Sequence, residues 1–227
     1  MMVPMTALEH ENRSMRHGMT AKWNRSVVLW RGLTLAALFI LAAELPGCAS
    51  LIGSGGGEQA LATFDLGAPG VVPSTKIVTA QVLVPEPGAL KALNSERILV
   101  RPNGSEIAYL PGAQWSDRLP RLIQQRLVQT FENVGHVRAG TPGQGLSIDY
   151  QVVTELRAFD YDASVHKARI ELGVKLLNDR TGKVVASDVF AGEAPVADDT
   201  PGGVTAGLDA LLMTEMKAIV AWTVKRL

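Results

Sequence analysis

The chain has 227 residues, and its 22 Lys and Arg balance its 22 Asp and Glu, so the formal net charge at pH 7 is zero. This length predicts one domain with a sizeable core, together with additional segments. A chain without a basic excess is not expected to neutralise nucleic-acid phosphates, which excludes a nucleic-acid partner. Its single cysteine excludes an intrachain disulfide and a thiolate metal site.

The first 47 residues follow the plan of a secretory signal peptide. Lys22, Arg25 and Arg31 precede an apolar run over residues 32–43. This run is shorter than the roughly 20 residues that a helix needs to span a bilayer. Met19 is an alternative start of translation, which would leave residues 1–18 upstream of the signal.

The only cysteine stands directly after this segment. Leu45, Pro46, Gly47 and Cys48 resemble the lipobox of bacterial lipoproteins, although Pro46 replaces the more common small residue. The resemblance implies cleavage before Cys48, a diacylglyceryl group on its thiol, and an acyl chain such as palmitate on its new amino group. Several acyl chains anchor a protein stably, whereas one holds it only marginally. The alternatives are an uncleaved membrane anchor and a buried free thiol.

The residue after the cysteine predicts the destination. In Gram-negative lipoproteins an Asp at this position tends to retain the protein at the inner membrane. Here the position is Ala49. The resemblance therefore implies delivery to the periplasmic face of the outer membrane.

Residues 48–74 are predicted to form a lipidated, flexible tether, and residues 75–227 the folded domain. The tether contains a glycine-rich stretch at 53–57 and little apolar periodicity. Within it, residues 62–66 form a small apolar island that could add an edge strand.

Three strands are expected at the start of the domain. Residues 77–84 are rich in β-branched side chains and end at Pro85. Residues 97–101 and 106–110 flank a turn at 102–105, which predicts a β-hairpin.

A helix is expected next. Ser116 or Asp117 can cap its free amides, and Pro120 is tolerated in a first turn. Apolar side chains then recur at helical spacing up to Val134, and Gly135 is a suitable stop.

The clearest pattern is alternation with period two. It covers residues 146–158 and 167–176, joined by a turn at 160–164, and predicts long antiparallel strands with one polar and one apolar face. A turn at 178–183 leads into a strand over 184–191. A closing helix is predicted over 203–226.

This order predicts an α+β domain with two layers. A mostly antiparallel sheet has a single apolar face, and two helices packed on that face would cover it.

No catalytic or metal-binding set is found in the sequence. His136 and His166 have no second ligand at suitable spacing and are read as surface residues. The pairs Asp160/Asp162 and Asp198/Asp199 lack the further oxygen ligands of a calcium loop. We therefore expect no metal, no cofactor beyond the lipid on Cys48, and no enzymatic activity.

The order of features resembles that of the ABC-type transport auxiliary lipoproteins. A lipobox is followed by Phe64-Asp65-Leu66, a strand ending in proline, Tyr109 shortly before Trp115, and a leucine-rich helix over 118–129. The long hairpin and the alanine-rich closing helix agree with this family over roughly residues 48–227.

The resemblance implies a non-catalytic role in lipid transport. Members of this family serve ABC transporters that work with MCE-domain proteins and move lipids or other hydrophobic molecules, so the expected partner is an MCE-domain protein. The alternative is an outer-membrane lipoprotein that helps to assemble or activate a secretion, lipopolysaccharide-export or cell-wall machine. Direct lipid carriage would need an enclosed apolar cavity. Homo-oligomers through exposed sheet edges also stay open.

A candidate partner contact is the segment from Tyr109 to Trp115. Aromatic residues beside a rigid turn are typical of interface hot spots. The alternative is that Trp115 packs the start of the helix onto the sheet.

Overall fold

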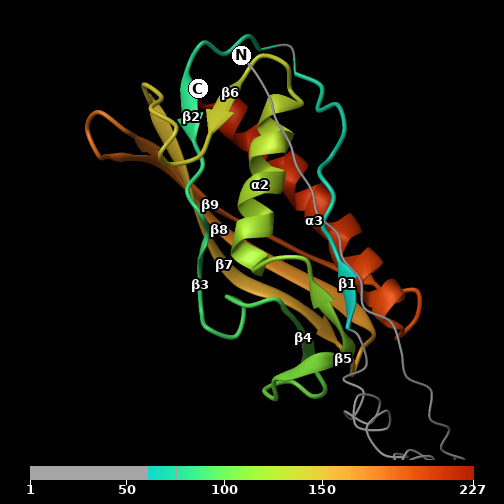
Figure 1. Ribbon diagram of the computed structural model, residues 1–227. Coiled ribbons are helices and arrows are strands. Elements are labelled where there is room, and N and C mark those ends of the chain that lie inside the picture. Colours follow the sequence, from blue (N-terminus) through green and yellow to red (C-terminus); the bar gives the residue numbers. More distant parts are fainter. Residues whose placement is uncertain (1–60, 75) are drawn as a thin grey trace, which may run out of the picture. The chain divides into compact units, whose positions relative to one another are not determined.

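The computed structural model describes residues 61–74 and 76–227 (Figure 1). The predictions for the signal peptide, the lipobox and Cys48 lie outside the described residues. What is described is one open sheet of nine strands with two helices, α2 (Leu119–Glu132) and α3 (Pro201–Val224).

Three long strands form one side of the sheet. They are β7 (Tyr150–Asp162), β8 (Lys167–Asn178) and β9 (Val184–Pro195), paired antiparallel in chain order. The alternation predicted from the sequence is confirmed, since every second residue of β8 from Ala168 to Leu176 is buried. The turn lies at residues 163–166, later than the predicted 160–164, because Tyr161 still pairs with Ala168 and the strand ends only at Asp162.

The other edge of β7 is shared by three short parallel strands. They are β2 (Gln81–Leu83), β3 (Gly88–Ala89) and β4 (Arg97–Arg101). The strand predicted over 77–84 is thus much shorter, and β3 carries too few residues to show a period. Three further strands extend the sheet outward: β6 (Arg138–Gly140) on β2, β5 (Ala108–Trp115) on β4, and β1 (Ala62–Phe64) on β5.

The packed region begins before residue 75. The apolar island forms the edge strand β1, and Leu66 and Val72 are only 2% and 6% exposed. The backbone N–H of Val72 donates to the carbonyl of Asn133 at the end of α2. The described part of the predicted tether therefore belongs to the core, and a reading of composition alone placed the boundary too late.

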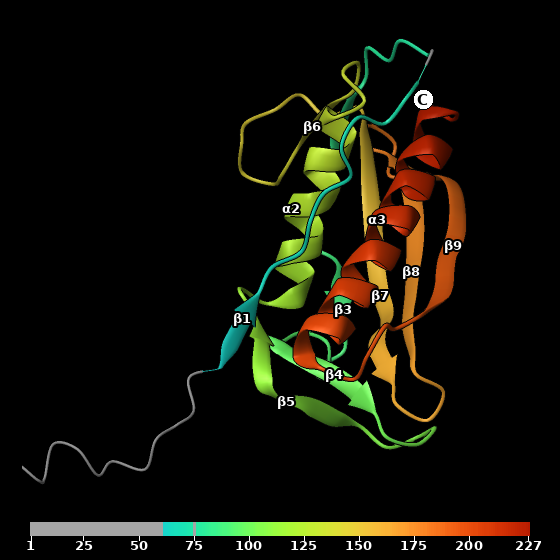
Figure 2. The ribbon, with the colours of Figure 1, turned by 90° about the vertical axis from the view of Figure 1, so that its right-hand side faces the viewer.

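Both helices cover the same face of the sheet (Figure 2). The first residue before α2 is Arg118, so the prediction of Ser116 or Asp117 as its cap is wrong; the Asp117 carboxylate instead accepts from the Arg118 N–H at 2.7 Å. The hydroxyl of Thr200 caps α3 by accepting from the Gly203 N–H at 3.1 Å. No helix in the described residues is long and apolar enough to cross a bilayer.

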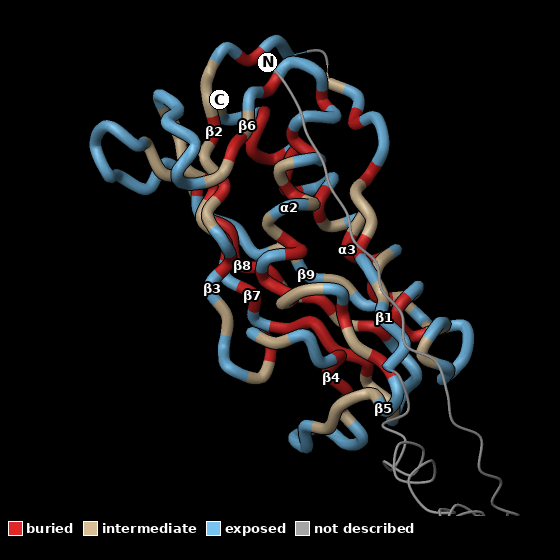
Figure 3. The backbone as a smooth tube through the Cα atoms, viewed as in Figure 1, coloured by how far each residue is buried: buried red, intermediate tan, exposed pale blue. Residues whose placement is uncertain are grey.

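The α3 helix crosses the sheet at a glycine. A Cβ at Gly192 of β9 would lie 3.0 Å from the Leu211 side chain and 2.7 Å from that of Glu215. Buried residues of both helices and of β7 and β8 belong to one core cluster, and Figure 3 marks buried residues in red along the backbone. The predicted α+β class with two layers is confirmed, and the difference lies in the short strands, which run parallel to β7.

One charged side chain is buried in the sheet. Asp160 of β7 is 1% exposed and accepts from Arg169 of β8, with Nη2–Oδ2 3.0 Å and Nε–Oδ1 3.2 Å. The Arg101 Nε of β4 lies 3.3 Å from the same carboxylate. The hydrogen bond from Arg169 to Asp160 raises the pKa of that guanidinium. The cluster joins the meander, which is the antiparallel set β7–β8–β9, to the β4–β5 hairpin.

We expect Asp160→Ala to lower the free energy of unfolding by about 3 kcal/mol, because two arginines would lose their shared buried partner. Urea denaturation of the two proteins measures the difference. Glu193→Ala is the control. It removes an exposed ion pair with Lys167 and should cost less than about 1 kcal/mol. Equal losses of unfolding free energy in the two variants would contradict a stabilising role of the buried Asp160 cluster.

Candidate partner-binding surface

Trp115 lies inside the domain. Its side chain is 1% exposed and meets the Phe159 ring edge-on, with centroids 5.9 Å apart and planes at 78°. Phe159 belongs to β7, so Trp115 fixes the end of β5 against the central strand just before α2 begins. Trp115 therefore has the packing role that the sequence analysis gave as the alternative to a partner contact.

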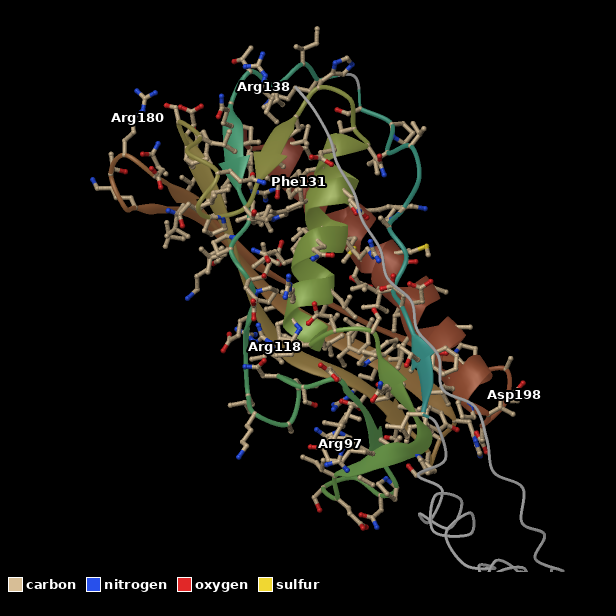
Figure 4. All side chains as sticks on the ribbon, viewed as in Figure 1. Arg97, Arg118, Phe131, Arg138, Arg180 and Asp198 are labelled. Carbon is tan, nitrogen blue, oxygen red and sulfur yellow. The ribbon has the colours of Figure 1, made fainter. Side chains whose placement is uncertain are left out.

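Tyr109 lies at the surface of the same strand. The Arg97 guanidinium of β4 stacks on its ring, with Cζ 3.5 Å from the centroid. Such a cation–π contact holds the ring in one orientation. In Figure 4 Arg97 stands at the β4–β5 end of the domain and Arg138 at the other end.

Between these two aromatic residues β5 bulges outward. Leu99 pairs with Tyr109 and Arg97 with Gln114, so Ile98 alone faces residues 110–113. Gly112 has φ +70°, a conformation that favours glycine, and Pro111 beside it is exposed. We name Tyr109, Leu110, Pro111 and Arg97 the β5 bulge surface. It combines an oriented aromatic ring with apolar residues and a rigid backbone, which suits a protein partner.

The helix-free face of the meander is ionic. Arg157 pairs with Glu155 at 3.0 Å and with Glu171 at 3.5 Å, and the hydrogen bond that Arg157 donates to Glu155 raises the pKa of the Arg157 guanidinium. A groove of about 600 Å³ crosses this face, and its base includes Gly173, where a Cβ would lie 2.8 Å from the Arg157 side chain. In the sequence the only sign of this groove is Gly173, which stands within the alternating pattern of β8. Its lining carries both Arg157 and Lys175 and the carboxylates of Glu86, Glu155 and Asp188, so it selects neither anions nor cations.

A small polar cluster closes the β7–β8 hairpin. Tyr161 donates to the Asp199 carboxylate, and His166 Nδ1 lies 3.0 Å from the Tyr161 hydroxyl and 2.9 Å from Asp199 Oδ1. Burial, followed by the hydrogen bond to Asp199 and its charge, raises the pKa of Tyr161 to about 12. Hydrogen bonds from Tyr161 and then from His166 lower the pKa of Asp199. The cluster ties the hairpin to the start of α3, a role that the surface reading of His166 did not include.

The remaining aspartates among the candidate ligands have local partners. Asp162 accepts from Ser164, and Asp198 accepts from Thr200 in the turn before α3. His136 is exposed in the turn after α2. Among residues 61–74 and 76–227, no group of three His, Cys, Asp or Glu side chains is placed to hold a metal ion. The geometry of the described domain offers contact surfaces.

Comparison with known proteins gives a consistent family. A sequence model of the ABC-type transport auxiliary lipoprotein component matches residues 64–220. An uncharacterized protein of Bradyrhizobium diazoefficiens is 32% identical over 184 residues, which are 79% of this chain and 49% of that protein. The chain thus spans about half the length of this curated relative.

Solved structures share the fold. The crystal structure of protein XCC0632 from Xanthomonas campestris superposes with a TM-score of 0.67 at 28% identity, covering 72% of this chain and 95% of that one. A second crystal structure, of an uncharacterized protein, has a TM-score of 0.57 at 11% identity and covers 73% and 97% of the two chains. The second likeness concerns the fold alone.

Two substitutions test whether Trp115 packs inside the domain while Tyr109 lies at its surface. We expect Trp115→Ala to cost about 3–5 kcal/mol of unfolding free energy, as for other large buried aromatics. Tyr109→Ala should cost less than about 1 kcal/mol, since it removes a partly exposed ring. Thermal melting of both variants tests this, and a stable Trp115→Ala protein would refute the packing role.

The Tyr161 cluster predicts an unusual tyrosine titration. Because its folded pKa is about 12 against an ordinary value of 10.0, the neutral phenol stabilises the fold below pH 10, and this contribution is lost as the pH rises through about 12. The tyrosinate absorbance of wild type minus that of Tyr161→Phe should have its midpoint near the higher value. Asp199→Asn should move this midpoint down. A difference midpoint near 10.0 in the wild type would be inconsistent with the cluster.

Proposed function

We propose that this chain, which belongs to the family of ABC-type transport auxiliary lipoprotein components, is the non-catalytic component that links an MCE-domain protein of a lipid transporter to the outer membrane. The family match over most of the folded domain is the observation that carries the proposal. Membership in a lipoprotein family indicates a membrane-anchored location in the cell envelope. The outer membrane and the MCE partner are our proposal, supported by the lipobox at Cys48 and by Ala49 after it.

The path of the chain fits a contact near the anchor. The domain begins at β1, and β1 pairs with β5 residues Ala113 to Trp115, next to the β5 bulge surface. Cys48 precedes Leu61 by 13 residues, and a chain of this length spans at most about 45 Å when extended. This length limits how far Leu61 can lie from the lipid-bearing residue, and Leu61 directly precedes β1, which pairs beside the β5 bulge surface.

The surface chemistry fits a partner of protein type. Tyr109 and Pro111 present rigid apolar area, and Arg97 adds a cation that is already oriented by the Tyr109 ring. Residues held in place before binding lose little conformational entropy when a partner docks. We infer that the MCE-domain protein contacts the β5 bulge surface.

A crosslinked pull-down from intact cell envelopes tests the proposal. The tagged full-length chain should recover an MCE-domain protein with its permease and ATPase. Tyr109→Ala should reduce this recovery about tenfold, with the domain still folded. Tyr150→Ala, which removes a half-buried tyrosine from the start of β7, is the matched control and should leave recovery unchanged.

Two outcomes would count against the proposal. Recovery of cell-wall or secretion components without any MCE-domain protein would favour the alternative envelope role, which the same fold could serve. In a separate arm, Cys48→Ala should move the protein out of the outer-membrane fraction. If it stays there, the anchor is not the cysteine.

A further inference from the structure

A second surface lies at the end of the domain far from the β4–β5 hairpin. Figure 2 shows the chain after β1 running along the two helices to this end and turning back into β2. An apolar groove of about 460 Å³ opens there between this segment and the last turns of α3. It is lined by Val72, Pro73, Ser74, Lys76, Val134, Val220, Ala221, Val224 and Lys225.

The groove has a basic rim. The only charged residues of its lining, all from the described part of the chain, are Lys76 and Lys225. Lys76 Nζ lies 3.4 Å from the carbonyl oxygen of Lys225 at the end of α3. The carbonyls at a helix C-terminus attract cations, so the helix end holds this ammonium beside the groove. The interior is made of valine, proline and alanine side chains.

The segment that forms one wall carries further apolar side chains in water. Val71 and Ile77, on either side of residues 72–76, are 84% and 75% exposed. Among the described residues of this segment, Val72 and Val78 are the ones that belong to the buried core. These two side chains add exposed apolar surface to the segment that forms one wall of the groove.

We propose that this groove binds one acyl chain whose anionic head group meets Lys76 and Lys225. The volume falls within the roughly 300–1,000 Å³ of small-ligand pockets. A rim with two ammonium groups and no carboxylate among the lining residues complements a carboxylate or a phosphate ester. The groove opens to solvent and is not an enclosed cavity, so a bound acyl chain would lie at the surface and could be exchanged. This differs from the enclosed cavity that lipid carriage through water would need.

The proposal goes beyond the docking role and does not depend on it. The β5 bulge surface and the groove share no residue. A chain that binds an acyl group at one end and a protein at the other could be tested for each separately. Failure of the pull-down would leave acyl binding untouched, and the reverse also holds.

Photocrosslinking in membrane vesicles tests the groove. Vesicles that hold the anchored full-length chain are mixed with probes that carry the same photoreactive acyl chain. The heads are a carboxylate, a phosphatidylglycerol or a neutral alcohol. Peptide mapping should place the carboxylate label on residues 71–77 or 220–225, at about ten times the alcohol signal. Label from both anionic probes identifies a phospholipid chain as the ligand, and label from the carboxylate alone identifies a free fatty acid.

Three variants make the test specific. Ala221 is exposed at the groove, so Ala221→Trp can fill the space without disturbing the core and should lower labelling about tenfold. The double change Lys76→Gln and Lys225→Gln should bring the carboxylate and alcohol signals to about the same level. Lys217→Gln, at an exposed position of α3 outside the groove, should behave as wild type.

The proposal is overturned by any of three results. The label could spread over the domain and persist in Ala221→Trp. The wild type could take up the neutral and anionic probes equally. The groove could instead crosslink to a protein segment, which would make it a second docking surface. Circular dichroism melts of each variant confirm that the fold is retained.

Discussion

The fold depends on the need to pair both edges of β7. A strand of 13 residues in the middle of a sheet has backbone N–H and C=O groups on two sides, and nearly all such groups must find partners when they are buried. The backbone groups along one edge of β7 pair with a single long strand, β8. The other is met in succession by β2, β3 and β4, each only two to five residues long. The connections between β2, β3 and β4 place each of these strands opposite the part of β7 with which it pairs.

This arrangement explains which parts of the fold could be predicted from the sequence. The meander is specified locally, because alternation over a dozen residues marks both the strand and its buried face. The short parallel strands are specified by tertiary pairing. Gly88–Ala89 and Arg138–Gly140 have no periodicity of their own, and β2 keeps only three of its eight predicted residues, which pair with β6 on one side and β7 on the other. The apolar island at 62–66 indicates a possible edge strand, but the sequence assigns the residues up to 74 to the tether because their few apolar side chains have no regular spacing, although Leu66 and Val72 are buried.

The candidate site was predictable to the same degree. Composition identified the segment from Tyr109 to Trp115 as unusual, but it could not say which aromatic ring points outward. The answer depends on the bulge in β5, since the extra residues opposite Ile98 set the register of the strand on each side. Trp115 then packs on Phe159 and Tyr109 stacks under Arg97. The groove beside Lys76 and the groove over Gly173 join segments far apart in sequence, so no local pattern could have indicated them.

The two ends of the domain differ in a way that bears on function. Near β1 the chain leads back toward Cys48, and the exposed features there are an oriented aromatic ring and a rigid bulge. At the C-terminal end of α3, whose 24 residues correspond to a helix about 36 Å long, the exposed features are apolar side chains and lysines around a groove. A protein contact rewards rigid, preorganised side chains, whereas an exchangeable acyl chain needs a smooth apolar trough with one charged end. If both surfaces act as proposed, the domain holds its protein partner at the end where β1 begins and a hydrophobic ligand at the end where α3 finishes.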